Sequence, residues 1–586
     1  MIDRKLLKKA RGEEKVDLVL RNGRLIDVFN KELIRADLAV SDGIIIGTGP
    51  YQGVEEIDLG GQLVSPGFID GHLHLESAMV RVEEFARRVI PLGTTTIVAD
   101  PHEIANVAGI EGIKYLLEAG RNLPWNLKLM LPSCVPATPF ETSGARLKAE
   151  DLSQLLGEDG IFGLGEVMDF PGVIRGDKEI WDKIALAGNR FKDGHSPGLR
   201  GQKLNSYLLA GIKADHECTT PAEALEKISK GMYIMIREGS VTRDLVSLLP
   251  AVRERNLSRF FLATDDRHPA DLLAEGHINY LIKKSVKQGL NPLKALKLAT
   301  INAALALGLE KTGALAPGYR ADLVVIDSLS NFNVKMVFKD GKQVAEEGRP
   351  LFKSTPRTEK CSLGKIFQSI RVGALDAKKF RLPPGRRYRV MELVEDQVIT
   401  KKRIMSLPVL PAGRTGAAAA ITEKALVEGD LVKLAVVERH HRTGNVGLGL
   451  LKGFGLKTGA IATSISHDSH NIIVTGLNEE EMFRAVREIE RMQGGLVIIK
   501  ERKVAGRLAL PIAGLMSEEP LEEVAGRLEE LREIAGSLGV RVKAPFMTLS
   551  FMALSVIPEL KLTDRGLFEL EAGKIVPLVV ESTTST

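Results

Sequence analysis

Residues 66–76 read Pro66-Gly67-Phe68-Ile69-Asp70-Gly71-His72-Leu73-His74-Leu75-Glu76. An apolar lead-in runs into two histidines that are separated by one residue. Because residues i and i+2 of a strand project to the same face, both imidazoles can reach one metal ion. A His-x-His pair also arises by chance, so the downstream sequence has to decide between a metal site and coincidence. Only 11 histidines occur in the 586 residues, and several more follow apolar, strand-like runs.

The length and composition indicate a soluble protein of several domains. A chain of 586 residues is too long for one core, and 44% hydrophobic residues are ordinary for a globular protein. The formal net charge of +5 does not indicate a nucleic-acid or membrane partner. No apolar run approaches the roughly 20 residues that cross a bilayer, and no signal peptide is recognisable. We therefore expect a cytoplasmic protein.

Strand and helix patterns alternate after Pro66. Apolar strand candidates end at His74, Asp100, Cys134, Met168, His195, Glu217, Arg237 and Asp266. Amphipathic helical patterns between them include 110–121, 178–189, 221–230 and 243–255. Eight such units over roughly 240 residues predict an α/β fold with a (β/α)8 TIM-like barrel over 66–309. A doubly wound sheet is the alternative, but the polar residues at the strand ends disfavour it.

Two stretches that flank the barrel read as short strands. Residues 16–64 alternate apolar and polar positions between turn signals, and an apolar strand pattern returns within 313–344. We predict that 1–65 and 310–350 pair in space as a small composite β domain.

The remainder of the chain divides into a linker and a further domain. Residues 351–384 are rich in Lys, Arg, Ser and Pro, and are predicted to be a linker. Residues 385–586 are predicted to form an additional C-terminal α/β domain. Its expected strands lie near 431–437 and 495–499, and its expected helices at 479–492 and 521–538.

Six polar residues stand at the ends of five barrel strands. They are His72 and His74 on the first, Glu166 on the fourth, His195 on the fifth, His216 on the sixth and an aspartate of the pair Asp265-Asp266 on the eighth. Four imidazoles and two carboxylates at one barrel mouth suit two divalent ions that Glu166 can bridge. Such a pair can generate hydroxide at neutral pH and clamp an electrophile. Singly, Glu166 could be a buried acid paired with a lysine, and His195 or His216 a satisfied loop histidine. Their joint placement favours a metal site.

This pattern resembles the amidohydrolase superfamily, and more narrowly the bacterial and archaeal adenine deaminases. The stretches that carry the resemblance are His72-Leu73-His74-Leu75-Glu76-Ser77, Asp100-Pro101-His102-Glu103-Ile104-Ala105-Asn106-Val107, Gly165-Glu166-Val167-Met168, Gly194-His195-Ser196-Pro197, Asp215-His216-Glu217, Ala263-Thr264-Asp265-Asp266-Arg267-His268 and Ile465-Ser466-His467-Asp468-Ser469-His470-Asn471. The resemblance therefore extends over nearly the whole chain.

The resemblance implies hydrolytic deamination of adenine to hypoxanthine and ammonia, in purine salvage. It implies that one metal is bound by His72, His74 and Asp265, the second by His195 and His216, with Glu166 and the attacking hydroxide bridging. Asp265 would also take the hydroxide proton and pass it to the amine. Glu217 would protonate the purine ring, although period-two alternation points it away from the metal face unless the strand has ended.

Five further residues are candidates for contact with the substrate. Glu76, Asp100 and His102 are candidates for purine contacts or an accessory metal, or for an ion pair at the barrel rim. Ser196, beside His195, is a further candidate. His467 lies in a polar loop that could close over the barrel mouth, or whose histidines could bind nearby backbone.

Two rival functions remain open at this point. A cyclic-amide hydrolase, such as a dihydroorotase or hydantoinase, usually carries a carboxylated lysine on strand four, where this chain has Glu166. A catalytically inactive scaffold would be expected to have lost part of the ligand set. The Pro-Cys-x-x-Cys signature of zinc deaminases that act on nucleic-acid bases is absent.

We therefore expect adenine as the small-molecule substrate and two divalent ions, manganese or iron, with zinc as an alternative. We also expect a homodimer without a nucleic-acid or membrane partner.

Overall fold

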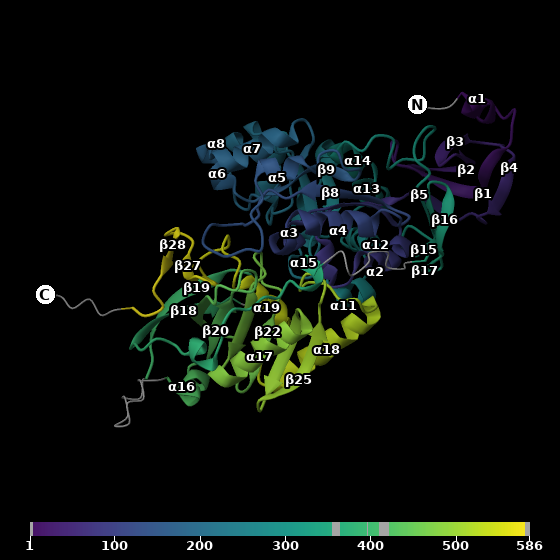
Figure 1. Ribbon diagram of the computed structural model, residues 1–586. Coiled ribbons are helices and arrows are strands. Elements are labelled where there is room, and N and C mark those ends of the chain that lie inside the picture. The colour runs from purple at the N-terminus through teal and green to yellow at the C-terminus, as the bar shows by residue number, and fades with distance from the viewer. Residues whose placement is uncertain (1–3, 354–363, 395–396, 409–420, 581–586) are drawn as a thin grey trace, which may run out of the picture.

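The computed structural model describes residues 4–353, 364–394, 397–408 and 421–580. Figure 1 shows a purple β sheet at one end of the molecule, a blue and teal barrel in the middle, and green and yellow C-terminal elements against the barrel. Among the described residues, no helix is both long and apolar enough to span a membrane.

Eight parallel strands form the predicted barrel. They are β6 (Phe68–Leu73), β7 (Thr94–Ala99), β8 (Asn126–Leu131), β9 (Ile161–Val167), β10 (Phe191–Gly194), β11 (Ala214–Asp215), β12 (Tyr233–Arg237) and β13 (Phe260–Ala263). The Lys213 amide donates to the Lys192 carbonyl (3.0 Å) and joins β10 to β11. The Asp265 amide donates to the His72 carbonyl (3.0 Å) and closes β13 onto β6. The (β/α)8 prediction is confirmed, and the carboxyl ends of all eight strands meet at one mouth.

Helices cover the outside of the barrel, which explains why its central strands are buried on both faces. They are α2 (Val82–Val89), α3 (His102–Ala108), α4 (Ile110–Gly120), α5 (Ala149–Ser153), α6 (Phe170–Arg175), α7 (Lys178–Ala187), α8 (Gly201–Leu209), α9 (Pro221–Ser229), α10 (Leu245–Leu248), α11 (Pro269–Ala274), α12 (Ile278–Lys287), α13 (Pro292–Leu298) and α14 (Ile301–Leu307).

The continuous helix predicted over 243–255 is wrong. The structure has only α10 there, followed by 3-10 turns at Leu249–Ala251 and Glu254–Arg259. Pro250 has no backbone N–H and cannot continue the hydrogen-bond ladder of an α-helix.

A nine-stranded sheet joins the two ends of the barrel segment. It contains β1 (Val16–Asp27), β2 (Glu32–Ser41), β3 (Ile44–Thr48), β4 (Gly53–Asp58), β5 (Leu63–Pro66), β14 (Leu323–Ile326), β15 (Val334–Lys339), β16 (Lys342–Glu346) and β17 (Arg349–Pro350). Strand β5 pairs in parallel with β1 and antiparallel with β14, where Val64 lies opposite Val325. Segments far apart in the sequence thus share one sheet before and after the barrel.

The C-terminal part is built on an eight-stranded sheet of order β19-β18-β21-β20-β23-β22-β24-β25. Its strands are β18 (Arg387–Leu393), β19 (Thr400–Ser406), β20 (Leu431–Val437), β21 (Val446–Lys452), β22 (Ala460–Thr463), β23 (Ile472–Gly476), β24 (Gly495–Lys500) and β25 (Lys503–Ala509). The smaller elements are α15 (Gly364–Phe367), α16 (Glu423–Glu428), α19 (Pro545–Phe551), β26 (Leu560–Thr563), β27 (Gly566–Glu569) and β28 (Lys574–Val576). Helix α17 (Glu479–Met492) packs on the sheet, and α18 (Leu521–Ser537) contacts both the sheet and α11 of the barrel.

The linker predicted over 351–384 needs correction in its second half. Ile370, Val372 and Phe380 are buried in the core beneath α17. The many Lys, Arg, Ser and Pro residues of this stretch conceal its apolar positions, which cover one end of the C-terminal sheet. Residues 354–363 of the same prediction lie outside the described residues.

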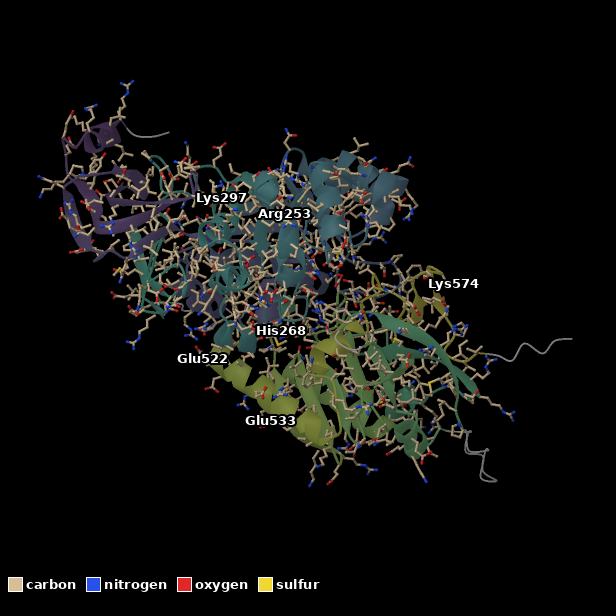
Figure 2. The ribbon with its side chains drawn as sticks, turned by 180° about the vertical axis from the view of Figure 1, so that it is seen from behind. Arg253, His268, Lys297, Glu522, Glu533 and Lys574 are labelled. Carbon is tan, nitrogen blue, oxygen red and sulfur yellow. The ribbon has the colours of Figure 1, made fainter. Side chains whose placement is uncertain are left out.

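The C-terminal part holds the loops at the barrel mouth. The Asp564 carboxylate accepts hydrogen bonds from the Thr142 amide (2.8 Å) and hydroxyl (2.7 Å), in the loop after β8. The Ser517 amide donates to the Met79 carbonyl (2.8 Å), after β6. In Figure 2, His268 lies where the barrel meets the C-terminal elements. The mouth is therefore enclosed by residues from both parts of the chain.

Candidate metal centre

His72 and His74 turn their Nε2 atoms toward one point. The two nitrogens lie 3.3 Å apart at the end of β6, and both side chains are buried. The Nδ1 of His72 is 2.8 Å from an Asp193 oxygen, and the Nδ1 of His74 is 3.0 Å from the Asp100 carbonyl. A ring whose Nδ1–H donates to an oxygen carries its lone pair on Nε2. Both histidines are therefore arranged to bind a metal through Nε2.

Glu166 faces two groups of histidines with its two oxygens. Its Oε1 lies 3.3 Å from His74 Nε2 and 3.8 Å from His72 Nε2. Its Oε2 lies 2.6 Å from His195 Nδ1 and 3.3 Å from His216 Nε2. One carboxylate that divides four imidazoles in this way has the geometry of a bridging ligand between two ions.

Asp265 completes the first group of ligands. Strand β13 ends two residues earlier, and Asp265 has a left-handed backbone with φ of 58°. Its Oδ1 lies 3.3 Å from His74 Nε2 and 3.7 Å from His72 Nε2. The structure thus brings all six predicted ligands together.

The charges of this cluster fit a divalent cation. Burial would raise the pKa of Glu166, but hydrogen bonds from His195, His216 and His74 hold that pKa well below its usual range. Burial would lower the pKa of His72, yet Asp193 and Asp265 raise it to about 10. The carboxylates therefore require positive charge beside them, and a cation that displaces the imidazole protons supplies it. The donor set of nitrogen and carboxylate oxygen fits manganese, iron or zinc.

Glu217 also faces the cluster. Strand β11 ends at Asp215, so the alternation that would have turned Glu217 away no longer applies. Its Oε1 lies 3.7 Å from His195 Nδ1 and 3.6 Å from His216 Nε2. The carboxylate is also paired with the Arg237 guanidinium.

Two predicted substrate contacts, Asp100 and Ser196, make hydrogen bonds inside the barrel, and their contact with substrate stays a prediction. Asp100 accepts hydrogen bonds from the amides of Glu166 (2.8 Å) and His102 (3.2 Å), and so joins β7 to β9. Ser196 is fully buried, and its hydroxyl donates to the Asp215 carboxylate. Both residues fix the positions of ligand-bearing backbone.

A cavity beside the cluster lies between the barrel and the C-terminal part. It is lined by Glu76, Ser77, Met79, Glu103, His268, Ile465, His467, His470, Leu515 and Met547. Three lining residues each keep a buried polar atom without a hydrogen-bond partner in the described part of the chain: Glu76 Oε2, His268 Nε2 and His467 Nε2. An unpaired buried polar atom costs about 1–3 kcal/mol, so these atoms are candidates for ligand contacts. The free volume of about 20 Å³ holds about one water molecule, and a larger ligand requires the enclosing loop to shift.

Glu103 connects the barrel to the loop 465–470, which encloses the cavity. The sequence did not predict Glu103 as a site residue. It stands in the first turn of α3, and its Oε1 accepts from His467 Nδ1 (2.8 Å). Its Oε2 contacts His470 Nε2. Both loop histidines therefore pair with a barrel carboxylate, and His470 Nδ1 also accepts from the Ser466 amide (3.2 Å), which is a contact with nearby backbone of the kind expected as the alternative.

Asp193 and Arg237 were also missed as site residues. Asp193 lies within β10, and a single acidic residue inside a strand gives no sequence signal of a functional role. Arg237 is the last residue of β12, so its place at a strand end was the one available signal.

Comparison with known proteins covers the whole chain. Residues 63–344 match the amidohydrolase family, and residues 397–574 match the adenine deaminase C-terminal domain. An adenine deaminase of Petrotoga mobilis is 54% identical over 99% of this chain and 100% of its own length. The chain belongs to the adenine deaminase family. Another member, adenine deaminase 2 of Carboxydothermus hydrogenoformans, is 48% identical over 98% of this chain and 99% of its own length.

The two matched regions of this adenine deaminase family member divide the site between them. The amidohydrolase region contains all six candidate ligands, and the adenine deaminase C-terminal region contains His467 and His470. The cavity is thus enclosed by both parts that the family comparison recognises.

Proposed function

We propose that this protein hydrolyses adenine to hypoxanthine and ammonia. The observation that carries the proposal is the division of four imidazoles between the two oxygens of Glu166, in a chain that matches adenine deaminases over its full length. Water adds its oxygen to C6 of the base. One of its protons ends on ring nitrogen N1 and the other on the departing amine, so that hypoxanthine and ammonia balance adenine and water.

The six clustered side chains would hold two divalent ions, manganese or iron, with zinc as an alternative. One ion would bind His72, His74 and Asp265, the second His195 and His216, and Glu166 would bridge them. When bound, the pair supplies a hydroxide at neutral pH and an electrophilic clamp.

Asp265 and Glu217 are proposed to move the two protons. Asp265 Oδ1 faces the histidine nitrogens, where it receives the proton of the attacking water and delivers it to the amine at C6. Glu217 Oε1 approaches the nitrogens of His195 and His216, where it would take up the second proton of the water and return it to N1 of the ring. The two carboxylates thus handle one proton each.

His467 and Glu76 are proposed to hold the base. Although burial lowers the pKa of His467, the Glu103 carboxylate that accepts from Nδ1–H raises it to about 9, so the ring is charged at neutral pH and its Nε2–H is a donor. The Phe551 ring stacks on the imidazole at 5.0 Å and fixes its plane. Glu76 Oε2 is an acceptor. Adenine offers ring-nitrogen acceptors for His467, and N–H donors at N6 and N9 for Glu76.

His102 was predicted to contact either the purine or an accessory metal, and both roles remain proposals. Its Nδ1 lies 3.4 Å from Glu166 Oε1, on the metal side of the site. That placement favours an accessory metal contact over a direct purine contact.

The rival functions account for the site less well. A carboxylated lysine on strand four would require a lysine on β9, which has none. The nearby buried ammonium of Lys183 donates instead to the Ser133 carbonyl (2.7 Å). An inactive scaffold does not explain why all six ligand positions are filled and share one centre.

The decisive assay compares adenine, adenosine, cytosine and dihydroorotate as substrates. The protein freed of metal and then supplied with manganese, iron or zinc should release ammonia from adenine alone. Hydrolysis of dihydroorotate without ammonia release from adenine would identify the cyclic-amide hydrolase instead.

We further propose a cytoplasmic homodimer with no nucleic-acid or membrane partner. The small net charge of +5 supports the absence of a polyanionic partner. Light scattering of the purified protein tests the assembly, with a mass near 128 kDa expected for two chains of 63.8 kDa.

A further inference from the structure

Arg237 is a buried cation that touches both carboxylates assigned to proton transfer. It ends β12, the seventh barrel strand, between the strands that lead to Glu217 and Asp265. Its side chain is 4% exposed. The seventh strand contributes none of the six candidate ligands, so this guanidinium is its contribution to the barrel mouth.

The guanidinium contacts each carboxylate at a defined oxygen. Nη1 donates to Asp265 Oδ2 at 3.0 Å and also to Glu217 Oε1, and Nη2 lies 3.3 Å from Glu217 Oε2. Because Oδ2 of Asp265 is engaged, its Oδ1 is the oxygen left facing His72 and His74. The pairing with Glu217 uses both oxygens, which fixes the plane of that carboxylate.

We propose that Arg237 is a positioning residue that holds the proton-handling oxygens of Asp265 and Glu217 at a fixed separation at the barrel mouth. This inference rests on the roles given to the two carboxylates under the proposed function. Two buried carboxylates repel each other, and without the cation between them they would rotate apart. A planar fork of donors can hold both at once, whereas the ammonium of a lysine is a single point of attachment.

Arg237→Met and Arg237→Lys test the role by steady-state kinetics and metal analysis. A misplacement of about 1 Å costs about 100-fold in rate, so Arg237→Met should lose about that factor in kcat. KM and metal content should change little, because Arg237 is not among the residues proposed to hold adenine or a metal. Arg237→Lys should recover part of kcat, and it also serves as the test if the Met variant does not fold.

A double mutant separates positioning from a general structural effect. If Arg237 acts through Glu217, then Arg237→Met should cost much less in a Glu217→Gln background than in the native protein. Asp244→Asn is the matched control, because Asp244 Oδ2 accepts from the outer side of the same guanidinium (3.1 Å). It should change kcat much less than Arg237→Met does, because Nη1 keeps its contacts with Asp265 and Glu217.

Three results would overturn the inference: native kcat in a metal-loaded Arg237→Met protein, a loss confined to KM or metal content, or full additivity with Glu217→Gln. Failure of the proposed function itself is distinguishable, because the native protein would then release no ammonia from adenine.

Discussion

Asp265 reaches the barrel mouth through a left-handed backbone turn, which non-glycine residues adopt only where the surroundings impose it. If Asp265 both binds metal and moves a proton, then Asp265→Asn should lose far more in kcat than in KM. General acid–base catalysis contributes about 10²–10⁴-fold, and at least that loss is expected. Asp266→Asn is the control, because the Asp266 carboxylate accepts from Ser77, which is not one of the six candidate ligands. Near-native kcat with intact metal in the Asp265→Asn protein would exclude the role.

Lys561 on β26 is a residue far from the chemistry whose burial predicts a pH effect on stability. Desolvation lowers its pKa from 10.5 to about 7, and its ammonium donates to the carbonyls of Val398 (2.7 Å) and Phe551 (2.9 Å). The unfolded chain therefore binds more protons than the folded one between pH 7 and 10.5, so stability rises with pH across that window. Below pH 7 the burial costs up to about 5 kcal/mol.

Lys561→Met should therefore raise the melting temperature at pH 7, and its advantage should shrink toward pH 10. Thermal unfolding of both proteins at several pH values measures the difference. A difference in melting temperature that does not vary with pH would contradict the burial effect.

Among the elements, the loop 465–470 and helix α3 depend on each other through Glu103. Glu103→Gln removes the charge that pairs with His467, and charge-assisted hydrogen bonds contribute about 1.5–3 kcal/mol. We expect KM for adenine to rise about tenfold or more while metal content is retained. Glu223→Gln, which removes a buried carboxylate that pairs with Lys227 on the outside of the barrel, should lower stability and leave KM unchanged. Equal KM values for the Glu103→Gln and native proteins would remove the loop from substrate binding.

Local sequence patterns predicted where several helices begin, but they did not predict contacts between distant segments. Helices α4, α7 and α9 begin at the predicted residues, because periodicity and capping are local signals. The bonds that Asp193 and Glu103 make to distant histidines depend on which strands and loops meet in space, and single acids carry no such signal. The hydrogen bonds that Ser196 and Asp100 make to other strands were likewise not predictable, and their contact with substrate stays a prediction.

At the scale of the whole molecule, the convergence of the six candidate ligands was predictable because every parallel strand of a barrel ends at the same mouth. The part played by the C-terminal sheet was less predictable, and the buried residues between 370 and 380 were assigned to a linker. The domain boundaries themselves stay predictions.

Removal of residues 351–586 should expose the cavity, because His467, His470 and Leu515 form one of its walls. We expect the remaining barrel to keep its metal and lose most of its activity, since water would enter the site. A folded, metal-loaded barrel that deaminates adenine at the full rate would show that the C-terminal part is dispensable for the chemistry.

The most direct test of a bridged pair of ions is a titration of metal-free protein with manganese, with bound metal and ammonia release from adenine followed together. Activity should rise to its maximum at two equivalents, and Glu166→Gln should bind less metal and release no ammonia, because Glu166 touches both groups of histidines. Full activity without metal, or full activity at one equivalent of metal, would contradict a bridged pair of ions.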